Sequence, residues 1–243
     1  EKFNLKNIVK PVRFIANAAG GLLPALAESL KRVFQTTILT SYGMTECMPI
    51  STPPQNYDLN PPGTSGTPVG PSILIVADDM QTILPNNQTG HIMINGLPCF
   101  KGYETDSYTL DRDSFYTING DINWFCTGDC GYLDEQGYLF ISGRSKEIIN
   151  RGGETISPFE IEEALIQHPS IKEACVFSVP HSHYQESIGA IIVMKSKIPR
   201  IDLQQLHEYL INHLQRSKWP QVLIYMDNLP KNNTNKILRI KLA

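Results

Sequence analysis

The sequence has no excess of basic residues: 21 lysines and arginines stand against 24 aspartates and glutamates, a formal net charge of −3. Such a balance lacks the positive footprint that nucleic-acid binding demands, so we expect no nucleic-acid partner. No apolar run approaches the roughly 18 residues of a transmembrane helix, and no signal-peptide pattern opens the chain. These absences predict a globular protein of the cytoplasm. A peroxisomal location stays open, although the sequence does not end in Ser-Lys-Leu.

The sequence also lacks the Cys-x-x-Cys pairs that are typical of zinc sites and redox motifs. Its five cysteines are odd in number, and they stand at positions 47, 99, 126, 130 and 175. Cys126 and Cys130 are close in sequence, but no histidine or further cysteine lies near them to complete a metal site. We therefore expect reduced thiols rather than a disulfide framework.

The length and composition of the chain fit one large or two ordinary globular domains. Of the 243 residues, 41% are apolar and 19% are charged, as in ordinary globular proteins. The first residue is Glu1 rather than methionine, and the chain begins in a strand-like segment. We therefore expect a piece of a longer polypeptide, with the upstream remainder of that polypeptide as a partner.

The first 143 residues show two different sequence patterns. Residues 1–60 read as strand, helix and strand, which predicts the end of a βαβ layer. The helix, "PALAESLKRVF", is opened by proline and carries Leu26, Leu30 and Val33 on one face. In residues 61–143, Gly, Pro and Asn separate short apolar runs, which predicts a small β-barrel subdomain.

A third sequence pattern begins near residue 147. "SPFEIEEALIQH" places Ser157 before a proline and Glu160 three residues later, which predicts a helix with a capping box. "ACVFSV" and "SIGAIIVM" predict buried strands, and "DLQQLHEYLINHL" predicts an amphipathic helix. Residues 147–243 thus form a smaller α+β C-terminal domain in our prediction, and the fold class of the whole chain is α/β followed by α+β.

One polar cluster follows a predicted strand. "SYGMTECM" offers Tyr42, Thr45 and Glu46 around a turn glycine, at the carboxyl end of a strand where α/β proteins often bind ligands. An aromatic ring suits a base, a hydroxyl suits a phosphate oxygen, and a carboxylate suits Mg²⁺. By itself the cluster also fits a plain polar loop.

Four sequence blocks in order make the pattern specific. They are "YGMTE" at Tyr42–Glu46, "WFCTGD" at Trp124–Asp129, the Gly-Arg of 143–144 followed by "PFEIE" at Pro158–Glu162, and the polar loop "LPKNNTNKILR" near the end. Together they resemble the adenylate-forming family of acyl-CoA synthetases, peptide-synthetase adenylation domains and luciferases. The resemblance covers essentially the whole chain.

The resemblance implies a nucleotide site. Tyr42 and Gly43 would lie against the base of ATP or AMP, Thr45 would contact phosphate, and Glu46 would hold Mg²⁺. Asp129 matches the aspartate that accepts hydrogen bonds from the ribose hydroxyls, a role that suits an acceptor-only carboxylate. Arg144 matches an arginine that contacts ribose or phosphate.

Further implied roles lie at two other places in the chain. Ala19 and Gly20 match a stretch along the adenine and acyl pocket, although a tight strand-to-helix turn explains them equally well. Lys146 falls at the family's hinge, within residues 144–146, and also fits a solvated charge at a strand edge. His181 and His183 alternate without a third metal ligand, so we interpret them as surface residues.

Two glycines and a lysine complete the implied machinery. Gly152 and Gly153 match the backbone that approaches the pantetheine arm of the acceptor, and a β-bulge would use the same two residues. Lys236 matches the lysine that bridges the acid and the α-phosphate, with Asn235 in place of the usual glycine. We interpret the neighbouring Lys231 as solvated.

One family block is missing from this sequence. The phosphate loop that ends in lysine lies upstream of Tyr42 in the family, and "PGTSGTPVG" at Pro62–Gly70 lies downstream and has no lysine, so we interpret it as structural. The implied function is that of an AMP-forming acyl-CoA synthetase fragment, inactive alone, that activates a small carboxylic acid with ATP and passes it to coenzyme A. Two alternatives stay open: an adenylation domain that loads a carrier protein, and a non-catalytic fragment that only binds.

Overall fold

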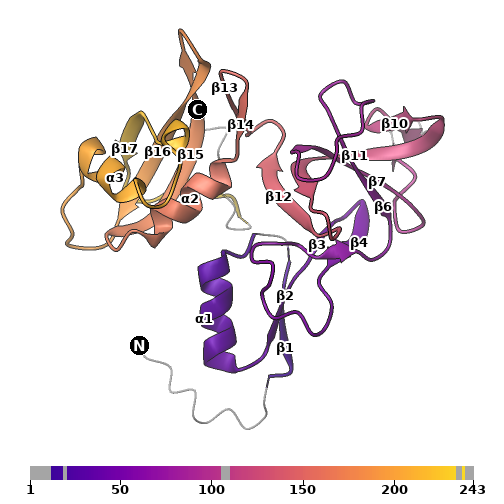
Figure 1. The fold of residues 1–243 in the computed structure, drawn as a ribbon, viewed down its shortest axis with the longest axis horizontal. Helices are drawn as coiled ribbons and strands as arrows, with labels where there is room; N and C mark the ends of the chain where they lie inside the picture. The colour runs from indigo at the N-terminus through magenta and orange to yellow at the C-terminus, as the bar shows by residue number, and fades with distance from the viewer. Residues whose placement is uncertain (1–11, 19–20, 105–109, 234–236, 239–243) are drawn as a thin grey trace. The chain divides into compact units, whose positions relative to one another are not determined.

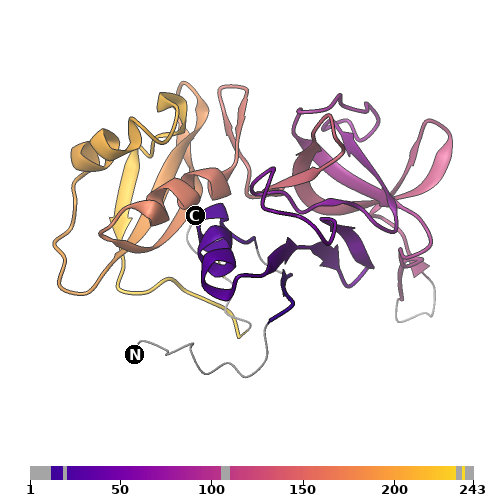
Figure 2. The same cartoon turned by 60° about the horizontal axis from the view of Figure 1, so that its bottom comes forward.

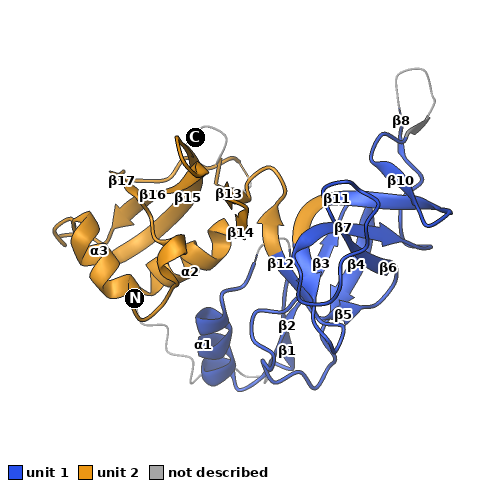
Figure 3. Cartoon of the chain, turned by 45° about the horizontal axis from the view of Figure 1, so that its top comes forward, with its two compact units in different colours: residues 1–127, 131–141 blue, residues 128–130, 142–243 orange. Residues whose placement is uncertain are grey.

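The computed structural model describes residues 12–18, 21–104, 110–233 and 237–238. Contacts divide the chain into two compact units, residues 1–127 with 131–141 and residues 128–130 with 142–243 (Figure 3). The fold is a sheet-rich mixture of α/β and α+β parts, as predicted. The finer boundaries at 60/61 and 143/144 stay predictions. Within the described ranges, no helix has the length and apolar character to cross a bilayer.

The first unit begins with a βαβ element. Strands β1 (Phe14–Asn17) and β2 (Thr37–Thr40) pair in parallel, and helix α1 (Pro24–Phe34) connects them. All three lie together in Figures 1 and 2. The helix starts at a proline, whose fixed φ suits the first turn, and it ends at Gln35 in a left-handed conformation. Its buried residue is Ala27, so the predicted apolar face that holds Leu26 is largely exposed in the described chain.

The rest of the first unit is antiparallel sheet. A three-stranded sheet consists of β3 (Tyr42–Met44), β4 (Cys47–Thr52) and β5 (Thr67–Pro68). A five-stranded sheet consists of β6 (Ser72–Val76), β7 (Gly90–Asn95), β10 (Phe115–Ile118), β11 (Asp121–Leu133) and β12 (Leu139–Arg144). Residues 128–130 of β11 and 142–144 of β12 belong to the second unit. A separate pair consists of β8 (Tyr103–Glu104) and β9 (Leu110–Asp111). The two larger sheets share one apolar core, in which Ile50 of β4 packs with Ile92 of β7 and Phe125 of β11. A shared core of this kind is what the predicted barrel requires.

The second unit is an α+β sandwich. Its strands are β13 (Ile149–Arg151), β14 (Glu154–Ile156), β15 (Ile171–His181), β16 (Gln185–Met194) and β17 (Val222–Tyr225). Its helices are α2 (Pro158–Gln167), α3 (Leu203–Leu210) and a short 3₁₀ turn, η2 (Arg216–Lys218). The central strand β16 pairs with β15 along its length and with β17 on its other side.

Alternation along β15 and β16 gives each face of this sheet its own core. On one face, Leu165 of α2 and Leu206 of α3 belong to the same buried cluster as Val176 of β15, so both helices cover that face (Figure 1). On the opposite face, Cys175 packs with Leu229 of the C-terminal segment. The period of two in these strands therefore decides which segment covers which face.

The predicted capping box of α2 is wrong. Ser157 makes no side-chain cap, because its hydroxyl donates to the carbonyl of Ser142 instead. Glu160 accepts a hydrogen bond from Lys218 at 2.7 Å. The capping box is found on α3, where the Asp202 carboxylate accepts from the Gln205 backbone N–H at 2.8 Å and the Gln205 side chain accepts from the Asp202 backbone N–H. At Ser157 a tertiary partner outweighs the local motif.

Candidate functional site

The Tyr42–Glu46 block forms a tight hairpin directly after the parallel strands. The backbone N–H of Ser41 donates to the Asn17 carbonyl at 2.9 Å, so the chain leaves β2 still bonded to the end of β1. Strands β3 and β4 then pair antiparallel, with Met44 opposite Cys47. This register places Thr45 and Glu46 at the tip of the hairpin, with Thr45 exposed. The block therefore lies just past the carboxyl end of the βαβ layer, where the sequence predicts it.

The Glu46 carboxylate has a defined partner. The phenol of Tyr103 donates to Glu46 Oε1 at 2.7 Å, and the backbone N–H of Phe100 donates to the Glu46 carbonyl at 2.8 Å. Tyr103 stands 57 positions further along the chain, so the spacing of residues gives no signal for this contact. Among the described residues, no three His, Cys, Asp or Glu side chains gather in a group that could hold a metal. A single carboxylate fits Mg²⁺ held together with substrate phosphates and water rather than in an all-protein cage.

The fold itself does not demand glycine at position 43. A Cβ atom there would meet Met48 Cγ at 3.4 Å and the Cys47 carbonyl at 3.5 Å, which is close to ordinary contact. Tyr42 beside it is half-buried. A side chain at position 43 would therefore fit in the described chain with small adjustments of Met48.

The second unit brings Asp129 and Arg144 together. Asp129 Oδ1 lies 3.0 Å from Arg144 Nε; the aspartate side chain is 11% exposed and the arginine side chain is 54% exposed. The backbone N–H of Ser145 donates to the Gly128 carbonyl at 2.9 Å, which ties the two segments at the same place. Gly128 has a φ of +75°, a conformation that favours glycine. The result is a fixed carboxylate next to an exposed, permanent positive charge.

Lys146 is exposed in a turn directly after β12. The backbone N–H groups of Glu147 and Ile148 both donate to the Arg144 carbonyl, at 2.9 and 3.1 Å, and these bonds close the turn around residue 146. A short turn between β12 and β13 is compatible with the predicted hinge. The hinge stays a prediction.

Gly152 and Gly153 form a two-residue hairpin turn. The strands β13 and β14 pair without interruption up to Arg151 opposite Glu154, so the β-bulge alternative is wrong. The glycines have φ values of +59° and +90°, as a type I′ turn requires. The Gly152 N–H donates to the Tyr184 carbonyl at 2.8 Å, and the Arg151 guanidinium lies 4.5 Å from the centre of the Tyr184 ring. The turn is thus held against an aromatic and cationic surface.

His181 and His183 belong to the same surface. The His181 ring lies 5.1 Å from the Tyr184 ring and 6.1 Å from the His183 ring, measured between centroids. Backbone N–H groups of His183 and Tyr184 donate to His181 Nδ1. His183 is exposed and His181 is half-buried, which supports the interpretation of both as surface residues.

Ala19, Gly20 and Lys236 lie outside the described residues. The structure describes the residues on both sides of the Lys236 loop. Lys231 and Ile237 pair in an isolated antiparallel β-bridge, and the Leu238 N–H donates to the Pro230 carbonyl at 2.9 Å.

Lys231 is exposed, as the prediction of a solvated lysine requires, but its side chain also has a partner. Its ammonium lies 2.5 Å from Glu173 Oε2 on β15. The hydrogen bond from Lys231 holds the pKa of Glu173 below its ordinary value. The two residues are 58 positions apart, so local sequence spacing does not predict this anchor.

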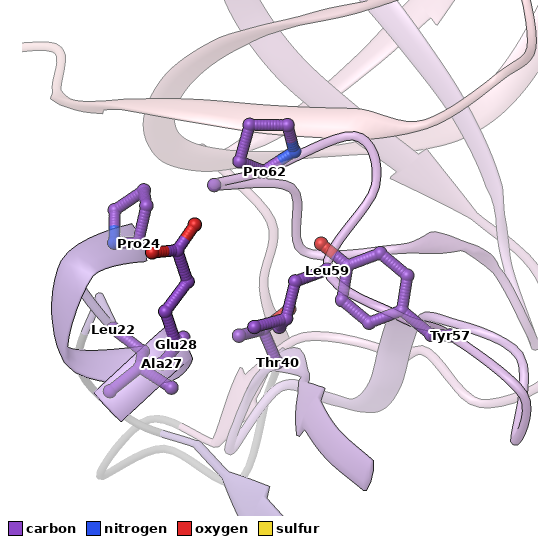
Figure 4. Close-up of a pocket in the computed structure, with 9 residues that line it drawn as sticks. Leu22, Pro24, Ala27, Glu28, Thr40, Tyr57, Leu59 and Pro62 are labelled. Atoms are coloured by element: carbon purple, nitrogen blue, oxygen red, sulfur yellow. The ribbon is translucent and has the colours of Figure 1, made fainter. Parts of the chain in front are cut away.

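One small cavity lies in the first unit, between α1 and the loop that holds Tyr57 (Figure 4). It has a volume of about 10 Å³ and is lined by Pro24, Thr40 and Leu59, among others. The Tyr57 hydroxyl donates to the Pro61 carbonyl at 2.5 Å, and burial raises the pKa of Tyr57 to about 12. The cavity has room for about one water molecule, so it is too small for a nucleotide.

Comparison with known families assigns two parts of the chain. Residues 2–104 match the family model described as AMP-binding enzyme, and residues 160–236 match that of the AMP-binding enzyme C-terminal domain.

The chain belongs to the AMP-binding enzyme family.

Relatives in this family include named CoA ligases. Oxalate–CoA ligase of Saccharomyces cerevisiae is 36% identical over 246 residues, which cover 98% of this chain and 44% of the yeast protein. The oxalate–CoA ligase of Arabidopsis thaliana is 33% identical over 230 residues, 94% of this chain and 43% of that protein. The chain therefore spans less than half the length of these relatives.

Solved structures of the family share the fold. The o-succinylbenzoate CoA synthetase of Bacillus subtilis, in complex with its acyl-adenylate intermediate, is 31% identical with a TM-score of 0.81, and the match covers 95% of this chain and 46% of that one. The same enzyme has been solved with ATP and a magnesium ion. ATP-bound MatB from Rhodopseudomonas palustris is 29% identical with a TM-score of 0.79, covering 93% of this chain and 44% of that one. The predicted family and fold class are confirmed.

Proposed function

We propose that this member of the AMP-binding enzyme family is the C-terminal part of a cytoplasmic acid–thiol ligase. In its first half-reaction a carboxylate oxygen attacks the α-phosphorus of ATP, and the P–O bond to pyrophosphate breaks to give an acyl-adenylate. In the second, the sulfur of coenzyme A attacks the acyl carbon and AMP leaves. The observation that carries the proposal is the likeness, over 95% of this chain, to a CoA synthetase solved with its acyl-adenylate.

The first unit supplies contacts to the nucleotide in this proposal. Tyr42 stacks on the adenine, Gly43 and the Ala19–Gly20 stretch let the backbone approach it, and Thr45 donates to a phosphate oxygen. Glu46 holds Mg²⁺, which offsets negative charge on the phosphates when it is bound. The position of Thr45 and Glu46 at one hairpin tip, after the carboxyl ends of β1 and β2, supports these roles.

The pair of Asp129 and Arg144 supplies the sugar contacts. The Asp129 carboxylate is almost buried and already held by Arg144, so it loses little freedom on accepting the two ribose hydroxyls. The Arg144 side chain is half-exposed, and its guanidinium has five N–H donors, enough for a phosphate or ribose oxygen besides the aspartate.

Lys236 supplies positive charge to the first half-reaction. Two anions approach each other when the acid attacks ATP, and negative charge concentrates on the oxygens around phosphorus. An ammonium group delivered at that moment stabilises the transition state more than the separated reactants. The described stem before its loop carries the 2.5 Å contact between Lys231 and Glu173.

The second half-reaction uses a different face of the C-terminal unit. Rotation about Lys146 replaces the Lys236 loop by the Gly152–Gly153 turn, along which the pantetheine arm of coenzyme A passes. Glycine at both turn positions leaves no Cβ atom in the way, and in the described chain no atom beyond Gly153 itself and its two chain neighbours lies within 4 Å of the place that a Cβ of residue 153 would take.

The acid is the finer part of the proposal. The relatives include oxalate–CoA, sulfoacetate–CoA and 2-succinylbenzoate–CoA ligases, whose names each specify an acid with a second acidic group. We infer a small acid of this kind, and oxalate is the first to assay.

The test uses the intact polypeptide that contains this chain. Lys236→Gln should slow acyl-adenylate formation by about 100-fold or more, the contribution of one charge-stabilising group. The same variant should convert a supplied acyl-adenylate and coenzyme A to acyl-CoA at the wild-type rate. Lys197→Gln, at an exposed position of the same unit, is the matched control. An equal loss of rate in both half-reactions would contradict the role assigned to Lys236. If the wild-type protein forms no acyl-CoA with any acid, the proposed ligase activity is refuted.

A further inference from the structure

The segment between β7 and β8 holds Glu46 at two points. At the backbone, the Phe100 N–H donates to the Glu46 carbonyl at 2.8 Å. Cys99 also pairs with Cys47, the residue after Glu46, in an isolated antiparallel β-bridge, and both cysteines are free thiols. At the side chain, the phenol of Tyr103, the first residue of β8, donates to Glu46 Oε1 at 2.7 Å. A single segment therefore fixes both the position of the residue and the direction of its carboxylate.

The tyrosine is itself held in place. Its ring lies 4.8 Å from the Phe100 ring with an interplanar angle of 66°, an edge-to-face contact. Phe100 in turn contacts Phe125 of the core at 5.0 Å between ring centroids. The donor to Glu46 is thus attached through two rings to the centre of the first unit, although the tyrosine is 44% exposed.

A glutamate at a hairpin tip would otherwise sample several rotamers. A carboxylate that accepts a charge-assisted hydrogen bond keeps one orientation, and the second oxygen then points in a defined direction. Among the residues that the structure describes, no side chain other than Tyr103 bonds this carboxylate. Groups that orient a metal ligand through its other atom commonly change metal affinity by about 10–100-fold when removed.

We propose that Tyr103 is a positioning residue for Glu46: its hydroxyl occupies Oε1 and so aims Oε2 at the divalent cation that accompanies the nucleotide. This inference rests on the proposed function, because it takes Glu46 as the ligand of that cation. It adds a residue from a separate segment to the cation site. It also explains why the carboxylate can serve at the end of an otherwise exposed turn.

The test is Tyr103→Phe in the intact polypeptide, with Mn²⁺ as a spectroscopic probe. Binding of Mn²⁺ to the ATP-saturated protein is measured by electron paramagnetic resonance, and AMP binding without metal is measured by calorimetry. The variant should bind Mn²⁺ about 10–100-fold more weakly. Its affinity for metal-free AMP should be unchanged, because the ring and its packing remain. Tyr116→Phe, a half-buried tyrosine of β10, is the matched control and should behave as wild type.

A second background separates positioning from general damage. In Glu46→Gln protein, Tyr103→Phe should have no further effect on Mn²⁺ binding, since the group that it orients is gone. Wild-type Mn²⁺ affinity in Tyr103→Phe would overturn the inference and leave the ligase standing. Equal weakening of Mn²⁺ and metal-free AMP binding would also overturn it, by showing a structural role. If the wild-type protein binds neither nucleotide nor Mn²⁺, the proposed function and this inference fall together.

Discussion

Replacement of Asp129 by asparagine should weaken AMP binding and leave the fold intact. Asparagine keeps the shape of the side chain and one acceptor oxygen, but it replaces the other oxygen by an N–H₂ donor. The ribose hydroxyls then lose at least one charge-assisted hydrogen bond, worth about 1.5–3 kcal/mol. Because the Asp129 side chain is only 11% exposed, water cannot easily substitute for the missing acceptor.

This free energy corresponds to a Kd for AMP about 10–150-fold higher than that of the wild type. Stability should change little, since the partner Arg144 is 54% exposed and its charge is not left buried. A loss below about 1 kcal/mol, which is typical of exposed ion pairs, lowers the Tm of a protein of roughly 150–250 residues by no more than about 4 °C, and that of the longer intact polypeptide by less.

The assay is calorimetric titration of AMP into the intact polypeptide, alongside thermal unfolding. Asp227→Asn, an exposed aspartate of the same unit, controls for the loss of one negative charge. Wild-type affinity in Asp129→Asn would refute the assignment of this carboxylate to the ribose. A drop in Tm of roughly 10 °C or more would show that the Asp129 carboxylate serves the fold instead.

The geometry supports three more predictions. The pair with Lys231 lowers the Glu173 pKa in the folded protein, so it should stabilise the fold by about 0.5–1 kcal/mol above about pH 4.5, and this contribution should be lost as the pH falls through the folded-state pKa. Urea unfolding of Glu173→Gln and of the wild type should therefore differ at about pH 7 and converge in acid, and a difference that does not shrink as the pH falls would contradict the pair. Cys47 and Cys99 face each other in an isolated β-bridge with their sulfur atoms 3.4 Å apart, so oxidised glutathione should convert them to a disulfide. The reaction should be slow at neutral pH, because burial raises the Cys47 pKa to about 12, and faster as the pH rises; peptide mapping that finds a different cysteine pair would refute the prediction. Gly153→Ala should slow thioester formation more than adenylate formation in separate half-reaction assays, because its φ of +90° strains any side chain, and equal slowing would contradict the assignment.

Patterns that depend on neighbours in sequence predict much of the fold. Two strand-like runs around a proline-opened helix predict the βαβ element, and β1 and β2 do pair in parallel around α1. Apolar alternation and a leucine face predict the α+β unit, and Leu206 and Leu210 do lie in its core. In each case the periodicity of burial is written locally in the chain.

Contacts between distant positions are not predictable in the same way. Ser157 has the residues of a capping box, yet its hydroxyl donates to Ser142. Lys231 resembles a solvated lysine, yet it pairs with Glu173 across 58 positions. A side chain with several competing partners is decided by tertiary packing, which a local pattern does not encode.

The candidate site likewise has features that the local motifs predict and contacts that only the fold shows. Its residue types and order are available from the motifs, and Thr45 and Glu46 do lie together at one hairpin tip. The contact of Arg144 with Asp129 and the bond from Tyr103 to Glu46 require the fold. The roles of these residues toward nucleotide and acid stay predictions.

The most direct test of the account is exchange of labelled pyrophosphate into ATP by the intact polypeptide. Acid activation through an acyl-adenylate is reversible, so label should enter ATP when an acid such as oxalate is added, without any thiol. Label entry that depends on the acid and is lost in Lys236→Gln is the result that we predict. The absence of exchange with every acid, in protein that binds AMP and Mn²⁺, would contradict the central claim and leave a nucleotide-binding protein without ligase chemistry.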